Sequence, residues 1–285
     1  MFRLLNVSGR SALEVDGTWF DLATVAGDET LADPMVAIAR SAELHALADR
    51  CTGSAPGGDV GTAPLGPPSP RPRQIFGIGV NYADHAAESG LEAPPAPLTF
   101  TKFPSAVAGP TADVPLSGEV VDWEVEIVAV IGSRCSRVER GRAWDMVAGL
   151  TLGQDVSDRA VQFTNTPPQF SLGKSFPAYA PIGPALVSVD SFDDPDDLAL
   201  WCDVSGERMQ SARSSQMIFS IPTLVAYLSS ICTLEPGDLI FTGTPDGVGM
   251  ARGRFLAEGD VIESGAEGIG GLTNRCVAGL GPVSL

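Results

Sequence analysis

Residues 121–132 read Val121-Asp122-Trp123-Glu124-Val125-Glu126-Ile127-Val128-Ala129-Val130-Ile131-Gly132. The β-branched and apolar residues of this segment predict a β-strand, and three acids occur at every second position. Because side chains two residues apart share one face of a strand, we expect Asp122, Glu124 and Glu126 to point the same way. The residues of the opposite face are apolar and are expected to be buried: Trp123, Val125, Ile127, Ala129 and Ile131.

Like charges on one face of a sheet repel each other, so the acidic face of this strand needs an explanation. One interpretation is a site for a hard metal cation, which would compensate the charge of buried carboxylates. The other is an amphipathic edge strand whose acidic face is in contact with water. The segment alone does not decide between these two interpretations.

The composition is that of a globular protein with a strong negative charge. Of its 285 residues, 44% are hydrophobic and 19% are charged. The formal net charge of −17 repels phosphate backbones and anionic membranes, so we expect neither a nucleic-acid partner nor a membrane partner. The same charge disfavours an anionic substrate unless a local cationic pocket or a bound metal ion overrides it.

The cysteines and the hydropathy pattern indicate the compartment. Five widely spaced cysteines include no Cys-x-x-Cys pair, so we expect reduced and mostly buried thiols. The N-terminal residues lack the apolar core of a signal peptide, and no run approaches the length of about 20 apolar residues that a membrane span requires. These features predict a cytoplasmic protein.

The first part of the chain predicts a small unit of residues 1 to about 50. Short strands are expected at residues 4–7 and 12–15, and Asp16-Gly17 is typical of a two-residue hairpin turn. A helix is expected at residues 31–49.

The following residues 51–74 are rich in Gly, Pro, Ser and Ala, which indicates a linker or an irregular covering segment. We therefore predict a small N-terminal α/β domain with its linker at residues 1–70 and a main domain at residues 71–285. The main domain shows many short strands separated by Gly/Pro turns, and its clearest helix is expected at residues 221–230. This pattern predicts an α+β protein that is mostly β.

Only two of the 18 basic residues are lysines, namely Lys102 and Lys174. In a chain with so strong a preference for arginine, the two ammonium groups are candidates for sites where a guanidinium cannot serve. Survival by chance is the alternative explanation for both.

A short helix is expected at residues 81–90, ended by Gly90. His85 and Glu88 would share one face of it, and a carboxylate in that position orients an imidazole and stabilises its protonated form. The pair is therefore a candidate general base. The alternative is an exposed ion pair without a catalytic role.

A further carboxylate, Asp155, ends an apolar run and enters a turn or a helix. Together with Glu124 and Glu126 it would form an oxygen site with open positions for water and substrate, which suits Mg²⁺ or Mn²⁺. Asp155 is equally suited to cap the following helix.

Six motifs, in their order along residues 75–285, resemble those of the fumarylacetoacetate hydrolase family. The motifs are Ile78-Gly79-Val80-Asn81-Tyr82 followed by His85-x-x-Glu88; Phe100-Thr101-Lys102-Phe103-Pro104-Ser105; Asp122-Trp123-Glu124-Val125-Glu126; Gln154-Asp155-Val156-Ser157-Asp158-Arg159; Gly173-Lys174-Ser175; and Thr242-Gly243-Thr244-Pro245-Asp246-Gly247-Val248-Gly249. The resemblance implies a mixed β-roll catalytic domain of the α+β class and a homodimer.

The resemblance also implies roles for individual residues. The implied metal ligands are Glu124, Glu126 and Asp155, which would hold one Mg²⁺ or Mn²⁺ ion per subunit. The implied catalytic residues are His85, Glu88 and Lys174, the last of which would stabilise oxyanion charge. The implied substrate-binding residues are Arg159, Gln162 and Thr244. Lys102 could support the metal-binding carboxylates.

The implied reaction is the metal-dependent hydrolysis of a carbon–carbon bond in a 2,4-dioxo acid, of the acylpyruvate or fumarylpyruvate type, to pyruvate and a carboxylic acid. The substrate would be a small anionic 2-oxo acid. Decarboxylation of a 2-oxo acid such as oxaloacetate and keto-enol tautomerisation or isomerisation, of the 2-hydroxyhepta-2,4-diene-1,7-dioate type, use the same residues. A non-catalytic metal- or ligand-binding protein would need neither His85 nor Glu88. The chain departs from the common family pattern at Pro177, where relatives often carry Asp.

Overall fold

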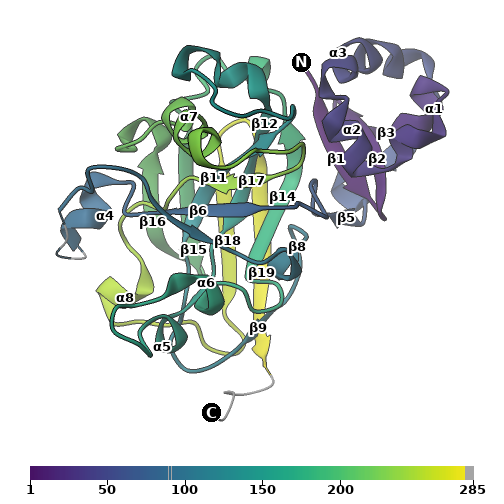
Figure 1. Cartoon of the computed structure of the whole chain (residues 1–285). Helices are drawn as coiled ribbons and strands as arrows, with labels where there is room; N and C mark the ends of the chain where they lie inside the picture. The colour runs from purple at the N-terminus through teal and green to yellow at the C-terminus, as the bar shows by residue number, and fades with distance from the viewer. Residues whose placement is uncertain (89, 91, 280–285) are drawn as a thin grey trace.

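The structure of the protein is a computed structural model, and it describes residues 1–88, 90 and 92–279. Its largest element is a 12-stranded sheet that extends from the N-terminal unit through the main body (Figure 1). The strand order is β4-β3-β2-β1-β14-β12-β11-β17-β6-β7, with β5 paired to β1 and β8 paired to β14. The strands of this sheet are β1 (Arg3–Val7), β2 (Arg10–Val15), β3 (Thr18–Asp21), β4 (Gly58–Asp59), β5 (Leu65–Gly66), β6 (Ile75–Gly79), β7 (Leu98–Thr101), β8 (Val107–Ala108), β11 (Val125–Ile131), β12 (Val147–Gln154), β14 (Ala180–Val187) and β17 (Leu239–Phe241).

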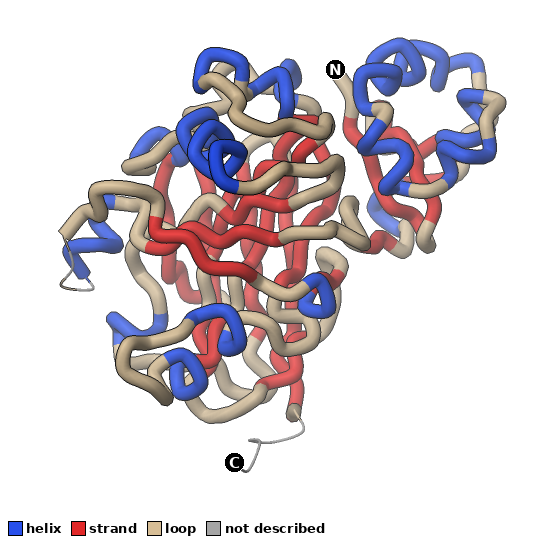
Figure 2. Tube along the Cα trace, in the orientation of Figure 1, coloured by secondary structure: helices blue, strands red, loops and turns tan. Residues whose placement is uncertain are grey.

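A five-stranded sheet packs against the large sheet, in the order β16-β15-β18-β19-β9. Strand β19 contacts β14 and β12, and β15 contacts β11, so the two sheets enclose a common core. Figure 2 shows these strands in the middle of the main body, with most helices around them. The remaining strands are β9 (Val114–Leu116), β15 (Ala199–Val204), β16 (Glu207–Arg213), β18 (Val261–Ala266) and β19 (Gly270–Ala278), together with the separate pair β10 (Val121–Asp122) and β13 (Ser157–Asp158).

The helices are short. The α-helices are α1 (Leu22–Ala26), α2 (Pro34–Ala39), α3 (Ser41–Arg50), α4 (Ala83–Glu88), α5 (Arg159–Gln162), α6 (Phe170–Gly173), α7 (Ile221–Ile231) and α8 (Gly249–Arg252). The single turns of 3₁₀ helix are η1 (Glu29–Ala32), η2 (Cys51–Gly53), η3 (Val60–Thr62), η4 (Pro104–Ala106), η5 (Arg140–Arg142), η6 (Trp144–Met146), η7 (Val189–Ser191) and η8 (Ser214–Gln216). The helix expected at 221–230 is therefore confirmed as α7 and extends one residue further.

The predicted hairpin of the N-terminal unit is confirmed. Asp16 and Gly17 connect β2 to β3, and both have positive φ angles of 49° and 76°. Such angles are those of the tight turns that match the twist of a hairpin. The helix expected at 31–49 is confirmed in part, because most of these residues are helical but belong to η1, α2 and α3. Asp33 is held extended because Pro34 follows it, so η1 ends and α2 begins there.

The segment 51–74 contributes two strands to the N-terminal sheet, so it covers that unit and is more than a linker. Strand β4 pairs with β3, and β5 pairs with β1. Strand β1 also pairs with β14 of the main body, with Leu4 opposite Leu186. The large sheet is therefore continuous across residue 70, and the predicted division at this residue stays a prediction.

The segment that carries the acids lies in the interior of the large sheet. Strand β11 is hydrogen-bonded to β12 on one side and to β17 on the other, and all seven of its residues are buried. The alternative of an edge strand with a water-facing acidic side is therefore wrong. The predicted strand is also interrupted, because Trp123 and Glu124 lie between β10 and β11.

Two findings concern the expectations from composition. No helix of the described residues is long and apolar enough to cross a membrane. The five cysteines are free thiols, and all of them except the half-buried Cys232 are buried, as predicted.

Candidate metal centre and active site

Three buried carboxylates meet where β11 and β12 lie side by side. Glu124 directly precedes β11, Glu126 is its second residue, and Asp155 directly follows β12. The register pairs Val125 with Gln154, and the amide of Asp155 donates to the carbonyl oxygen of Glu124 at 2.8 Å. One oxygen atom from each carboxylate lies within 4.8 Å of the other two. This buried set of hard oxygen donors fits a cation such as Mg²⁺ or Mn²⁺.

Three basic side chains surround these carboxylates. Lys174 Nζ lies 2.6 Å from Glu124 Oε2 and 2.6 Å from Asp155 Oδ2. Lys102 Nζ lies 2.5 Å from Asp155 Oδ1, and Arg159 Nη2 lies 2.6 Å from Glu124 Oε1. Both lysines of the chain therefore belong to the acid cluster. Their charges compensate the carboxylates, which would otherwise be costly to bury.

The pKa values of the two glutamates shift in opposite directions. Burial raises the pKa of Glu126 well above its usual range, and the charges of Asp155 and Glu124 raise it further. Burial also acts to raise the pKa of Glu124, but the charges of Lys174 and Arg159 outweigh burial and hold this pKa below its usual value. Glu126 is therefore the glutamate that retains a proton to higher pH when no cation is bound.

We expect metal binding to release a proton from Glu126. A carboxylate binds a cation only after deprotonation, so metal affinity should rise as the pH increases through the raised pKa of Glu126. In the metal-free protein, the raised pKa of Glu126 also makes the stability of the fold depend on pH. The stabilisation by Glu126 is complete below its pKa in the unfolded chain, about 4.3, and is lost as the pH rises through its raised pKa in the folded protein. Calorimetric Mg²⁺ titrations in buffers of different ionisation enthalpy count the protons. An affinity independent of pH would contradict this expectation.

Two buried glutamines hold the chain at the interruption between β10 and β11. Gln154 Oε1 accepts from the amide of Glu124 at 2.9 Å, and Gln154 Nε2 donates to Ser264 Oγ at 2.8 Å. Gln210 Oε1 accepts from the amide of Val125 at 3.1 Å. The amides of Glu124 and Val125 are therefore hydrogen-bonded by glutamine side chains. These bonds fix the backbone that carries Glu124 and Glu126.

Gln210 also holds the loop that follows β17. Its Nε2 donates to Thr244 Oγ1 at 2.8 Å, and the Thr244 hydroxyl donates to the carbonyl oxygen of Val125 at 2.9 Å. The amide of Gly243 donates to Glu126 Oε2 at 2.8 Å. Thr244 therefore lies at the acid cluster, where its hydroxyl ties the loop to β11. Gln210 was not predictable from the sequence, because it comes from β16 of the other sheet and belongs to no local motif.

His85 and Glu88 form a hydrogen-bonded pair on α4. His85 Nδ1 lies 2.8 Å from Glu88 Oε1, and the two side chains are only 13% and 20% exposed. Glu88 Oε2 accepts from the amide of Gly247 at 2.9 Å, which ties α4 to the loop after β17. Burial acts to raise the pKa of Glu88, but His85 and the Gly247 amide hold it below its usual range. The same loop carries Gly243, whose amide donates to Glu126, so the loop connects α4 to the acid cluster.

Arg159 and Gln162 lie on α5, next to the acid cluster. Asp158 caps this helix by accepting from the amide of Val161 at 3.0 Å, so the alternative that Asp155 is the cap is wrong. Arg159 Nη1 donates to Gln162 Oε1 at 3.0 Å. Gln162 Nε2 is buried and has no hydrogen-bond partner among the described residues. A buried donor of this kind is normally satisfied by water or by a bound molecule.

Asp122 does not join the other acids. Its oxygens accept from the amides of Gly249 at 2.6 Å and Met250 at 2.9 Å, and from Arg159 Nη2 at 2.7 Å. The expectation that the three alternating acids point the same way is confirmed in part. Asp122 Oδ2 and Glu124 Oε1 both accept from Arg159 Nη2, at 2.7 Å and 2.6 Å, but Asp122 is not one of the clustered carboxylates. Asp122 instead holds Arg159 beside the cluster.

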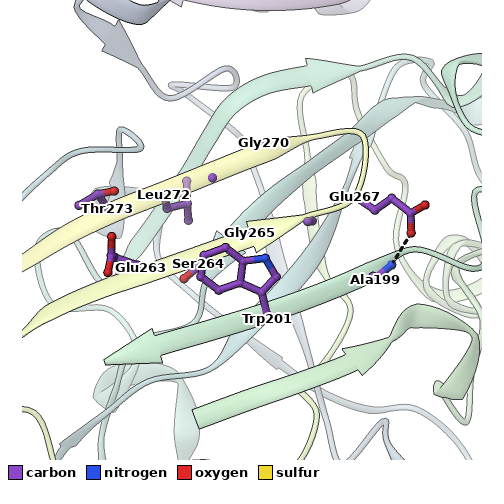
Figure 3. Close-up of a pocket in the computed structure, with 11 residues that line it drawn as sticks. Ala199, Trp201, Glu263, Ser264, Gly265, Glu267, Gly270, Leu272 and Thr273 are labelled. Carbon is purple, nitrogen blue, oxygen red and sulfur yellow. Dashed lines mark hydrogen bonds between the residues drawn. The ribbon is translucent and has the colours of Figure 1, made fainter. Parts of the chain in front are cut away.

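A separate hollow of about 540 Å³ lies on the five-stranded sheet, beside Trp201 (Figure 3). Its acidic residues include Glu267, which accepts from the amide of Ala199 at 3.1 Å and pairs with Arg213 at 3.3 Å. None of the predicted site residues lines this hollow. The candidate chemistry therefore belongs to the carboxylate cluster at β11 and β12.

The mostly β fold and the buried carboxylate cluster are those of a candidate metalloenzyme. Residues 74–277 match the family model described as fumarylacetoacetate (FAA) hydrolase C-terminal. This match spans more than half of the chain and includes every predicted site residue. The chain belongs to the fumarylacetoacetate hydrolase family, as the motifs predicted.

Individual proteins of known sequence or structure are similar to the chain over nearly its whole length. A Burkholderia multivorans protein, named as a proposed hydrolase, is 40% identical over 270 residues, which cover 90% of this chain and 91% of the relative. A Mycobacterium smegmatis structure, of a proposed HpcE protein, is 43% identical with a TM-score of 0.90 and coverage of 97% and 99%.

Two further structures carry names of specific enzymes. Maleylpyruvate hydrolase from Sphingobium sp. SYK-6, in complex with manganese(II) and pyruvate, is 26% identical with a TM-score of 0.81 and coverage of 97% and 99%. 2-Hydroxyhepta-2,4-diene-1,7-dioate isomerase from Mycobacterium marinum is 28% identical with a TM-score of 0.75 and coverage of 98% and 99%. Proteins similar to this chain thus include a hydrolase and an isomerase.

Proposed function

We propose that this protein is a divalent-metal-dependent hydrolase that cleaves the carbon–carbon bond of a 2,4-dioxo acid. The observation that carries this proposal is the His85–Glu88 pair, whose carboxylate is held by the amide of Gly247. A hydrolase needs a base that removes a proton from water, whereas decarboxylation of a 2-oxo acid needs no such base. A fixed and largely shielded imidazole, on a helix tied to the loop that contacts Glu126, is suited to that task.

Substrate binding would use hydrogen-bond donors of α5 and the ammonium group of Lys174, which follows α6. Arg159 and the unpaired Nε2 of Gln162 would bind the carboxylate of a small anionic 2-oxo acid. Lys174 would stabilise negative charge that develops on the substrate oxygens, and Thr244 would line the same pocket. A substrate carboxylate would thereby satisfy a donor that the described residues leave unpaired.

In the proposed reaction, His85 removes a proton from water and Glu88 stabilises the resulting imidazolium. The water oxygen bonds to the carbonyl carbon distal to the substrate carboxylate. The bond between this carbon and the neighbouring methylene carbon then breaks, and its electron pair stays with the pyruvate fragment. A proton returned to that methylene carbon completes pyruvate, and the other product is a carboxylic acid. One water molecule is consumed for each bond cleaved.

The proposed cofactor is one Mg²⁺ or Mn²⁺ ion per subunit, held by Glu124, Glu126 and Asp155. When bound, such an ion supplies Lewis-acid stabilisation of the substrate oxygens. The manganese in the similar maleylpyruvate hydrolase supports a divalent ion. The homodimer implied by the family resemblance is part of the proposal, and light scattering of the purified protein tests it.

Proton NMR of the products tests the reaction. The protein is incubated with acetylpyruvate and separately with oxaloacetate, each with Mg²⁺ and with EDTA. We expect acetate and pyruvate from acetylpyruvate only when Mg²⁺ is present. Pyruvate formed from oxaloacetate but not from acetylpyruvate would favour a decarboxylase. Exchange of the enol protons without cleavage would favour a tautomerase or isomerase.

A further inference from the structure

A second hollow adjoins the candidate active site. It has a volume of about 370 Å³ and lies between β7 and the start of α6. Its apolar lining consists of Leu98, Phe100, Pro168 and Phe170, and the other described lining residues are threonine, serine and glutamine. None of these lining residues is charged, although the chain as a whole carries a net charge of −17. The hollow is therefore suited to an uncharged group.

The two elements that line this hollow lead directly to the lysines of the acid cluster. Lys102 follows the last residue of β7, and Lys174 follows the last residue of α6. Lys174 Nζ lies 4.7 Å from the centre of the Phe100 ring, which also lines the hollow. The Thr101 hydroxyl lies 3.2 Å from Ser171 Oγ, which ties the two elements together. The Phe100 ring is thus a wall shared by the hollow and the candidate active site.

Aromatic rings continue outward from this wall. The rings of Phe100 and Phe170 meet edge to face at 6.0 Å, and those of Phe170 and Phe163 at 6.3 Å. Phe163 is 47% exposed, so the row ends at the surface. A Cβ atom at Gly77 would lie 2.2 Å from the Phe100 ring, so the glycine makes room for the ring in this position.

We infer that this hollow binds the acyl arm of the substrate and selects acylpyruvates whose arm is apolar and uncharged. This inference rests on the proposed hydrolase function. A second carboxylate at the end of the arm would lose its hydration without gaining a cation, because none of the described residues that line the hollow is charged. Maleylpyruvate and 2-hydroxyhepta-2,4-diene-1,7-dioate each carry such a second carboxylate. The preferred substrate of this chain is therefore a monocarboxylate.

A series of substrates tests the selection. With Mg²⁺ present, kcat/KM is measured for acetylpyruvate, hexanoylpyruvate and maleylpyruvate. We expect kcat/KM to rise at least about tenfold from acetylpyruvate to hexanoylpyruvate, because the added methylene groups leave water. We expect maleylpyruvate to be at least about tenfold poorer than acetylpyruvate. A preference for maleylpyruvate would overturn the inference.

A substitution that places a cation in the hollow tests whether the acyl arm binds there. Thr99 is an exposed residue of the hollow, and Thr99→Arg adds a cation to it. We expect this variant to lower kcat/KM for hexanoylpyruvate and to raise it for maleylpyruvate, each at least about tenfold. Thr273→Arg is the matched control, because Thr273 is an exposed strand residue of the hollow beside Trp201. Equal effects of both substitutions, or no effect of Thr99→Arg, would contradict the assignment.

A binding measurement separates this inference from the proposed reaction. The Mg²⁺-loaded protein is titrated by calorimetry with 2-oxooctanoate and with 2-oxoadipate, neither of which is a 2,4-dioxo acid. We expect 2-oxooctanoate to bind more tightly than 2-oxoadipate, and we expect Thr99→Arg to reverse this order. That result would support binding of the arm in the hollow even if acetylpyruvate is not cleaved. Cleavage of acetylpyruvate without any preference for apolar arms would instead refute the hollow and leave the hydrolase proposal intact.

Discussion

The Glu126→Gln protein is expected to bind Mg²⁺ more than about 100-fold more weakly than the unchanged protein and to lose metal-dependent turnover. The substitution keeps the shape of the side chain, and an amide oxygen can still accept from the amide of Gly243. It removes the charge from one of the three clustered carboxylates, all of which are buried. The loss should therefore concern the cation and not the fold. Calorimetric titration with Mg²⁺ measures this affinity.

Two comparisons sharpen this prediction. The thermal stability of the metal-free Glu126→Gln protein should be no lower than that of the unchanged protein, because burial and neighbouring charges already disfavour the Glu126 carboxylate. Glu263→Gln is the matched control, since this exposed residue of β18 lies in the hollow beside Trp201. Tight Mg²⁺ binding by the Glu126→Gln protein would show that the cation binds elsewhere.

The His85→Ala protein is expected to bind Mg²⁺ normally and to lose about 10²–10⁴-fold in kcat for acylpyruvate hydrolysis. This range is the usual contribution of a general base. His85 is paired with Glu88, and it is not one of the three clustered carboxylates. Steady-state kinetics and a parallel Mg²⁺ titration separate the loss of the base from a loss of the cation.

The second histidine of the chain provides the control for this substitution. His45 packs edge to face on Phe2 in the N-terminal unit, with 5.1 Å between the ring centres. His45→Ala should therefore leave kcat unchanged. A kcat of the His85→Ala protein within threefold of the unchanged value would remove His85 from the proposed reaction.

The period-two alternation of the acids predicted part of the candidate site. It correctly brought Glu124 and Glu126 together, and the end of an apolar run correctly marked Asp155. The alternation did not show that Asp122 binds Arg159 and the amides of Gly249 and Met250 and stays outside the cluster, because these partners come from distant parts of the chain. The periodicity of a sequence gives the face of a side chain only while the backbone remains regular.

Other features were beyond local patterns because they depend on tertiary contacts. Gln210 reaches the start of β11 from the other sheet, and no spacing in the sequence connects it to Val125. The continuity of the large sheet likewise depends on the pairing of β1 with β14, whose partners Leu4 and Leu186 lie far apart in the chain. The mostly β class was predictable from short strands and turns, whereas the order of the strands was not.

The most direct test of the proposed metal centre is a crystal structure of the protein with Mn²⁺, with anomalous scattering measured at the manganese edge. We expect one anomalous peak per subunit, about 2.0–2.6 Å from oxygens of Glu124, Glu126 and Asp155. We also expect that Lys174 Nζ no longer bridges Glu124 and Asp155, which it contacts at 2.6 Å in the structure described above. A peak outside these carboxylates, or no peak at saturating Mn²⁺ with Lys174 still bridging them, would contradict the proposed metal centre.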